Sequence, residues 1–180
     1  MKKIATFLTV LLLVGVTYAT SQPAAGKKFE FSTAFSFTSF KFSADTESTT
    51  ILSLPLRIGY FLWQGLEIET ELMAMKFDDS DLGYHLSGNL SYNFKAGQVV
   101  PFILGGAGFG NGFSAGPLVE GGTGVRAFLI NAGAGVKILI GQSGAVRIEY
   151  RFTRNRLSET GFEPETINSH QIFMGLSLFF

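Results

Sequence analysis

The charged residues of this sequence recur at every second position within short apolar segments. The segment Glu67–Glu71 carries three glutamates in this spacing, and the segment Arg147–Arg151 carries an arginine, a glutamate and a second arginine. A period of two is that of an extended strand, whose successive side chains point to opposite faces. The charged side chains of each segment therefore share one face, where they can form ion pairs or act as acids and bases.

His85 and Ser87 follow the glutamates with the same spacing. Together with a nearby acid they supply the residue types of a serine hydrolase, in which the histidine activates the hydroxyl and the carboxylate orients the histidine. The alternation, however, places both side chains on the polar face of their segment. We interpret them as part of a polar interior and predict no catalytic residue.

Sites for metals and nucleotides have little support in the sequence. It contains no cysteine, which excludes a disulfide framework and a thiolate metal site, and its two histidines, His85 and His170, stand apart from clustered carboxylates. The glycine run Gly105–Gly112 lacks both the spacing of a dinucleotide fingerprint and the lysine of a phosphate-binding loop. We predict neither a metal nor a cofactor.

The elements that must position the charged residues are segments of alternating polarity separated by turn residues. Short turns near Gln64, Gly97 and Gln142 alternate with longer connections, among them a loop from Arg154 to Thr166. A change of parity among the phenylalanines of the first segment predicts a bulge or a switch of face near Thr38. We predict strands at about residues 28–40, 52–62, 66–75, 82–93, 99–110, 128–140, 146–153 and 167–180.

The two faces of these strands differ in a way that bears on solvent. One face carries Leu, Ile, Phe and Tyr, and the other carries the charges together with Gly and Ser, with the charges at strand centres. In a soluble sandwich or a lipocalin-like barrel the apolar face points inward, whereas in a membrane barrel it points to lipid. The membrane arrangement predicts a polar network in the lumen from Arg57, Glu67, Glu69, Glu71, His85, Lys137, Arg147, Glu149 and Arg151.

Charges inside so narrow a barrel must find partners. Eight strands enclose an interior only just wide enough for their own side chains, and an unpaired buried charge is costly. Counting across the turn at Gln64 places Arg57 opposite Glu71. Counting across a turn centred on residue 143 places Lys137 opposite Glu149. Both pairs have opposite sign, so we predict a salt-bridged core that fills the lumen.

The last strand carries the strongest family signature. Large apolar residues occupy alternate positions back from the end of the sequence, at Phe180, Leu178, Leu176 and Met174. This pattern resembles the terminal strand of bacterial outer-membrane β-barrels, where it is the recognition signal for the barrel-assembly machinery. The strand rhythm of residues 28–180 is similar to that of the small eight-stranded family, which includes the OmpA membrane domain, OmpX, OmpW-like and opacity porin-like proteins.

The resemblance implies an all-β fold, an eight-stranded antiparallel up-and-down transmembrane β-barrel. It also implies outer-membrane lipid and lipopolysaccharide as surroundings and the barrel-assembly machinery as a partner. Outer-membrane lipid A deacylases carry a His-x-Ser pair, but theirs lies on a late strand and faces lipid. Here His85 and Ser87 belong to the fourth strand and face inward by parity, which argues against that activity.

The rest of the composition fits an exported single-domain protein. The chain has 180 residues and a formal charge of +0, so no basic surface for nucleic acid is expected. Residues 1–19 resemble a secretory signal, with Lys2 and Lys3 before an apolar run and Ala19 at the cleavage site. A membrane anchor is the alternative, but the run is too short for a spanning helix. Residues 20–27 form a short lead, and residues 28–180 form the barrel domain.

Three classes of function follow from this interpretation. The first is a structural or interaction role of an integral outer-membrane barrel in the cell envelope. The second is a narrow, porin-like channel for small solutes, and the third is a lipid A-modifying hydrolase. The sequence favours the first, because it predicts a filled lumen and no catalytic set.

Overall fold

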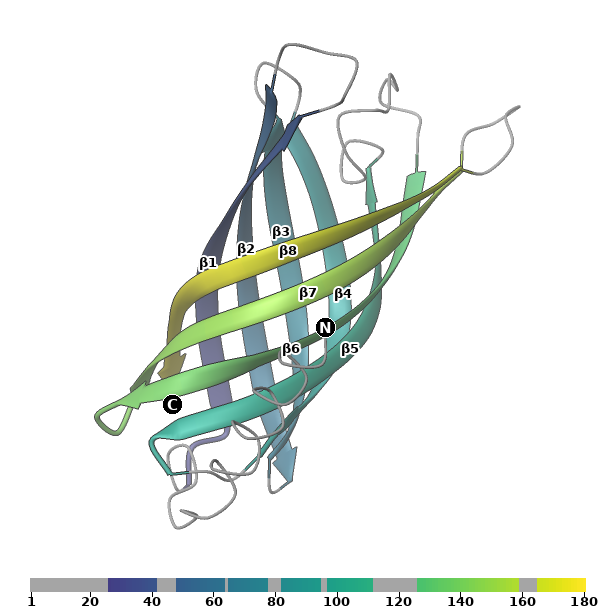
Figure 1. The fold of residues 1–180 in the computed structure, drawn as a ribbon. Helices are drawn as coiled ribbons and strands as arrows, with labels where there is room; N and C mark the ends of the chain where they lie inside the picture. The colour runs from purple at the N-terminus through teal and green to yellow at the C-terminus, as the bar shows by residue number, and fades with distance from the viewer. Residues whose placement is uncertain are drawn as a thin grey trace, which may run out of the picture.

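A computed structural model describes residues 26–41, 48–63, 65–77, 82–94, 97–111, 126–158 and 165–180, with backbone alone for 37–41, 48–50, 77, 158 and 165. The predicted signal segment, residues 1–19, lies outside these ranges. The described chain forms β1 (Phe29–Lys41), β2 (Ser48–Trp63), β3 (Leu66–Phe77), β4 (Leu82–Asn93), β5 (Val99–Asn111), β6 (Arg126–Ile140), β7 (Gly144–Ser158) and β8 (Glu165–Phe179). Each strand pairs antiparallel with the next, and β8 pairs with β1 to close the barrel (Figure 1).

Three tight turns and the C-terminus lie at the same end of the barrel, the lower end in Figure 1. Glycines with positive φ stand in all three turns, at Gly65 (94°), Gly97 (51°) and Gly141 (65°). A residue with a Cβ is strained in this left-handed region, so glycine makes each tight reversal possible. The predicted turns near Gln64, Gly97 and Gln142 are therefore confirmed in position.

The strands are strongly staggered around the barrel. A row of paired residues that leaves β1 at Thr33 reaches β8 at Thr166, whereas Thr33 itself pairs with Leu176, ten residues further along β8. Such a stagger tilts the strands relative to the barrel axis. The seam between β1 and β8 runs from Glu30↔Phe179 to Phe35↔Met174, and above it the two strands diverge in Figure 1.

The predicted class and all eight strands are confirmed, but two details were wrong. The predicted loop from Arg154 to Thr166 is shorter, because β7 continues to Ser158 and β8 already begins at Glu165. The prediction ended β7 where its outward residues cease to be apolar, although the alternation itself continues. There is also no bulge near Thr38: the register of β1 and β2 is unbroken to Lys41, and the shift in β2 falls between Phe61 and Trp63 instead. Parity among apolar residues does not distinguish a bulge from an apolar residue at an inward position.

The burial pattern is inverted relative to that of a water-soluble protein. Leu54 and Leu90 are 46% and 52% exposed on the outside, while Glu69 and Arg147 are each 1% exposed inside. Outward aromatic rings contact one another at the turn-side end, with Phe29 and Tyr60 centroids 5.1 Å apart. An apolar outer band of this kind is typical of membrane barrels, in which aromatic residues gather at the edges of the band.

Within the described ranges, no helix is long and apolar enough to cross a membrane.

Candidate functional site: the charged interior of the barrel

Every charged side chain that the sequence assigned to the lumen is buried there. Inward and outward side chains alternate along each strand, as in β4, so a charged residue between two outward apolar residues must point inward. Charged residues cluster at the inward positions of β2, β3, β6 and β7, and His85 is on β4. The nine predicted residues, all 5% exposed or less, are Arg57, Glu67, Glu69, Glu71, His85, Lys137, Arg147, Glu149 and Arg151.

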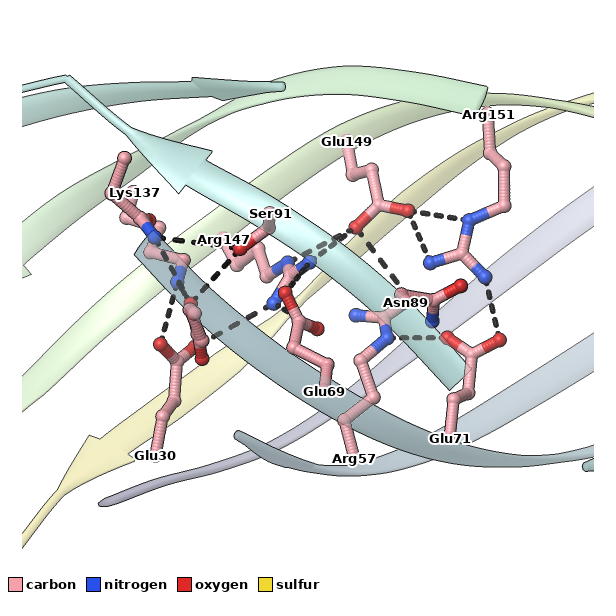
Figure 2. Close-up of polar contacts among 12 residues, drawn as sticks. Glu30, Arg57, Glu69, Glu71, Asn89, Ser91, Lys137, Arg147, Glu149 and Arg151 are labelled. Atoms are coloured by element: carbon pink, nitrogen blue, oxygen red, sulfur yellow. Dashed lines mark hydrogen bonds and ion pairs between the residues drawn. The ribbon is translucent and has the colours of Figure 1, made fainter. Parts of the chain in front are cut away.

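The turn-side part of the network joins Lys137 to carboxylates on the opposite wall. The Lys137 Nζ lies 2.5 Å from the Glu30 Oε2 and 3.0 Å from the Glu67 Oε2 (Figure 2). Lys137 belongs to β6, whereas Glu30 and Glu67 belong to β1 and β3. The ion pairs therefore cross the lumen rather than run along one strand.

Arg147 continues the network toward the barrel centre. Its two terminal nitrogens donate to both oxygens of Glu69, at 3.0 and 3.2 Å, which is the bidentate geometry of a strong arginine–carboxylate pair. The same guanidinium lies 2.9 Å from Glu149 and 3.6 Å from Glu30. Arg147 thus links carboxylates from three strands.

The central part of the network is built on Glu71 and Glu149. Glu71 accepts from the Arg57 Nε and from the Arg151 Nη1, each at 2.5 Å. Glu149 lies 2.5 Å from the Arg151 Nη2 and 3.6 Å from the Arg57 Nη2. Figure 2 shows the two carboxylates and two guanidinium groups facing one another across the lumen. The arrangement offsets the cost of burying each charge.

Only one of the two cross-strand pairs predicted from the register is correct. Arg57 does lie opposite Glu71, with the side-chain contact just described. Lys137, however, lies opposite Arg147, and Glu149 lies opposite Gly135. The β6–β7 turn is centred on residue 142 rather than 143, and a shift of one residue there moves every pairing by two. The like charges of Lys137 and Arg147 are tolerated because each reaches a carboxylate on another strand.

Two inward phenylalanines, Phe102 of β5 and Phe173 of β8, lie beside the charged groups. The Arg147 guanidinium lies 4.5 Å from the centroid of Phe102, and the Lys137 Nζ lies 5.4 Å from it. Arg57 and Arg151 lie 5.6 and 5.2 Å from the centroid of Phe173. These distances allow cation–π attraction, which is stronger where water is excluded.

Two inward glycines leave the space that these bulky groups occupy. A Cβ at Gly59 would stand 1.9 Å from the Glu67 Oε1, and a Cβ at Gly135 would stand 2.6 Å from the Phe102 ring. Real carbon atoms do not approach so closely. The glycines on the polar face therefore belong to the packing of the network.

The sequence interpretation missed several members of this interior. Glu30 is 2% exposed and contacts Lys137, yet it was not among the predicted residues. Asn89 accepts a hydrogen bond from Asn131, and Ser91 donates one to Glu67. Parity was a sufficient signal for Glu30, because it stands between two outward phenylalanines. Glu30 was omitted because the prediction rested on segments in which charges repeat at every second position.

The histidine and serine that suggested a hydrolase do not form a catalytic pair. The His85 Nε2 lies 3.4 Å from the Glu71 Oε1, and the Ser87 hydroxyl lies 3.5 Å from the same oxygen. Among the described residues the His85 Nδ1 has no hydrogen-bond partner, so neither ring nitrogen is positioned on the Ser87 hydroxyl. In the same part of the chain, no group of three His, Cys, Asp or Glu residues is arranged to hold a metal ion.

Three solved structures share this architecture. Neisserial surface protein A matches 88% of this chain and all of its own, with a TM-score of 0.62 and 15% identity. The N-terminal β-barrel domain of Pseudomonas aeruginosa OprF matches with a TM-score of 0.55 and 17% identity, over 87% of this chain and all of its own. The outer membrane enzyme PagL matches with a TM-score of 0.53 and 19% identity, over 81% of this chain and 97% of its own.

The chain has the fold of the small eight-stranded outer-membrane β-barrels. No protein-family model and no curated protein matches the sequence significantly. Because these neighbours include an enzyme and share less than a fifth of their residues with this chain, the fold alone does not assign an activity.

The interior of this outer-membrane barrel fold changes character along its axis. Toward the end away from the tight turns it holds an apolar cluster from four strands, formed by Ala34, Ile51, Met73, Met75 and Phe173. The salt-bridge network lies on the turn side of this cluster. Along the barrel axis, the lumen is therefore filled by the salt-bridge network on the turn side and by the apolar cluster beyond it.

The predicted assembly signal lies on the outer surface of β8. The side chains of Met174, Leu176, Leu178 and Phe180 are 47%, 58%, 49% and 65% exposed. The backbone of Phe180 bonds to Lys28 and Phe29, which anchors the end of β8 to the start of β1. Recognition of this strand by the assembly machinery stays a prediction.

Proposed function

We propose that this protein is an integral outer-membrane barrel with a structural or interaction role and a closed lumen. The single observation that carries the proposal is the continuous salt-bridge network between β1–β3 on one wall and β6–β7 on the other. An ion crossing the barrel would have to break several buried, mutually paired charges, and each such break costs several kcal/mol, on the order of 3–5. The outward apolar face and the likeness to outer-membrane barrels support the location.

Conductance in planar bilayers tests the closed lumen. We expect the wild-type protein to insert without discrete current steps at modest voltage. The matched variant carries Arg147→Ala together with Glu69→Ala, which removes one bidentate pair and leaves the net charge of the lumen unchanged. If the salt-bridge network closes the lumen, this variant should conduct ions. An outward control, Leu90→Ala, should behave like the wild type. Regular conductance steps from the wild-type protein would instead establish the narrow channel.

A strain that lacks the protein tests the structural role in the envelope. We expect increased sensitivity to detergents and large antibiotics, because loss of a structural barrel weakens the permeability barrier. Complementation with the Leu90→Ala variant should restore resistance. Lipid A from the two strains should have the same mass; a loss of one acyl chain that depends on Ser87 would favour the hydrolase and contradict the proposal.

A further inference from the structure

The outer face of β6, β7 and β8 changes composition in steps toward the end away from the tight turns. Paired residues form cross-strand rows on this face. From the turn side outward, these rows are Val136–Ile148–Met174, Ala134–Tyr150–Ile172, Ala132–Phe152–His170, Ile130–Arg154–Asn168 and Phe128–Arg156–Thr166. On β7 and β8, aliphatic residues therefore give way to aromatic residues and histidine, and then to arginine, asparagine and threonine. On β6 the outward residues stay apolar as far as Phe128, and the outward charge begins at Arg126.

The polar groups begin at a definite row. Tyr150 and His170 share a hydrogen bond of 2.6 Å on the exposed surface, and the His170 ring lies 5.1 Å from Phe152. Tyrosine and histidine with one apolar and one polar side are typical of the boundary between hydrocarbon and headgroups. Arg154 is two residues beyond Phe152, about 7 Å along the strand. It therefore stands at headgroup level, where an outward arginine costs little.

Three arginines gather at this level. Arg154 and Arg156 are exposed on the same face of β7, and Arg126 of β6 is exposed at the position diagonal to Arg156. Diagonal neighbours on a sheet stand about 7–8 Å apart, within reach of long side chains. Asn168 and Thr166 on β8 flank the two β7 arginines and are also exposed. These five residues are the outer arginine cluster.

Among the side chains that the structure describes, the charges on this outer surface all have one sign. Every carboxylate whose side chain the structure describes lies inside the barrel, at Glu30, Glu67, Glu69, Glu71 and Glu149. No ion pair among the described residues includes Arg126, Arg154 or Arg156. The cluster thus presents guanidinium groups, each with five donors, to the headgroup layer. Guanidinium matches phosphate with paired hydrogen bonds, and Asn and Thr suit the hydroxyls of a sugar.

We propose that the outer arginine cluster binds a phosphate of the phosphorylated glycolipid in the outer leaflet, lipopolysaccharide. The inference rests on the proposed location in the outer membrane, with the tight turns on the periplasmic side. It assigns a lipid site to the outside of β6–β8, independent of what the lumen does. Figure 1 shows the loop-side ends of β7 and β8 at the upper right.

The test measures lipid binding by the full-length mature protein in detergent, with native mass spectrometry as the readout. The probes are bisphosphorylated lipid A, dephosphorylated lipid A, phosphatidylglycerol and inorganic phosphate. The main variant carries Arg154→Gln and Arg156→Gln. One control, Arg154→Lys with Arg156→Lys, keeps the charge but not the paired donors, and another, Lys28→Gln, removes an exposed charge at the opposite end.

We expect the wild-type protein to prefer phosphorylated to dephosphorylated lipid A. The glutamine variant should bind the phosphorylated form about tenfold more weakly, because charge-assisted hydrogen bonds are lost. The lysine variant should fall between the two, and Lys28→Gln should match the wild type. Heat-dependent electrophoretic mobility verifies that each variant is folded.

Three results would overturn the site. They are equal binding of phosphorylated lipid A by the wild type and the glutamine variant, equal arginine-dependent binding of phosphatidylglycerol, and displacement of lipid A by inorganic phosphate at similar concentration. Flotation with lipid vesicles separates this failure from failure of the proposed location: a protein that floats but lacks the phosphate preference loses only the lipid site. A barrel that conducts ions but still prefers phosphorylated lipid A would contradict only the proposal that the lumen is closed.

Discussion

Arg147 shows how single residues hold this barrel together. Its guanidinium contacts Glu30 of β1, Glu69 of β3 and Glu149 of its own strand, β7. A planar group with five donors can serve three carboxylates at once, which a lysine cannot do with the same geometry. Because the groups are buried, every donor that loses its acceptor retains the full cost of desolvation.

Neutralising Glu71 should destabilise the barrel strongly. Glu71→Gln keeps the shape but leaves Arg57 and Arg151 buried with less negative charge beside them. We expect the free energy of unfolding to fall by about 3–5 kcal/mol, measured by urea titration in lipid vesicles. The adjacent outward residue provides the control, and Thr70→Val should change the midpoint little. Equal midpoints for the two variants would contradict a stabilising role of the network.

At the scale of the element, β8 closes the barrel and its sequence is constrained on both faces. Its inward face packs against β1 so closely that a Cβ at Gly175 would stand 2.0 Å from the Thr33 carbonyl oxygen and 2.5 Å from Ala34. Its outward face carries the apolar residues of the predicted assembly signal. The inward face therefore serves the folded seam, and the outward face, which carries the predicted assembly signal, is exposed.

A methyl group at Gly175 should open the β1–β8 seam. Gly175→Ala is expected to cost at least about 1–3 kcal/mol, because the clash is with backbone that cannot rotate away. Gly88→Ala is the matched control, since nothing lies within 4 Å of a Cβ at that position. Thermal unfolding followed by circular dichroism measures both. A Gly175→Ala barrel as stable as Gly88→Ala would show that the seam is looser than described.

The side chain of Phe180 should matter for assembly in cells but not for the folded barrel. It is 65% exposed, and only the backbone of Phe180 bonds to β1. We expect Phe180→Ser to refold in detergent as well as the wild type, while less of it reaches the outer membrane of growing cells. Quantitative immunoblotting of membrane fractions measures the latter. An unchanged amount in the outer membrane would contradict the prediction that Phe180 belongs to an assembly signal.

At the scale of the molecule, the carboxylate side chains that the structure describes all lie inside the barrel, whereas basic side chains lie on both sides of its wall. The formal charge of the sequence is +0, yet every carboxylate described is inside, and the charged side chains described on the outside are all basic. The interior charges pair with one another, and the exterior ones are proposed to face the headgroup region. Salt screens exposed charges far more than buried ones.

Stability and lipid binding should therefore respond differently to ionic strength. We expect the urea midpoint of the wild-type barrel to change little between low and high sodium chloride, since its ion pairs are buried. Binding of phosphorylated lipid A should weaken markedly over the same range. Parallel titrations of one preparation measure both. A midpoint that falls in step with lipid binding would indicate that water and salt reach the network.

The alternation of the sequence determined the class, the eight strands and the inward face of the nine predicted lumen residues. Each of these depends on a local property, the period of two, so residues such as Glu69 and Leu90 could be assigned from their neighbours alone. Apolar residues on the outward face were a poor guide to the end of β7, because the outward Arg154 resembled the start of a loop. The pairing of Lys137 with Glu149 was wrong for a different reason, since the centre of the turn was misplaced by one residue.

Only the tertiary structure decided which charges meet. Lys137 pairs with Glu30 and Glu67, and Arg147 pairs with Glu69, across a lumen whose width and ten-residue stagger arise when β8 meets β1. Closure is a property of all eight strands together, so no spacing within a segment of sequence encodes these contacts. The sequence specified that the charges face inward, and the closed barrel selected their partners because it fixes the distance between opposite walls.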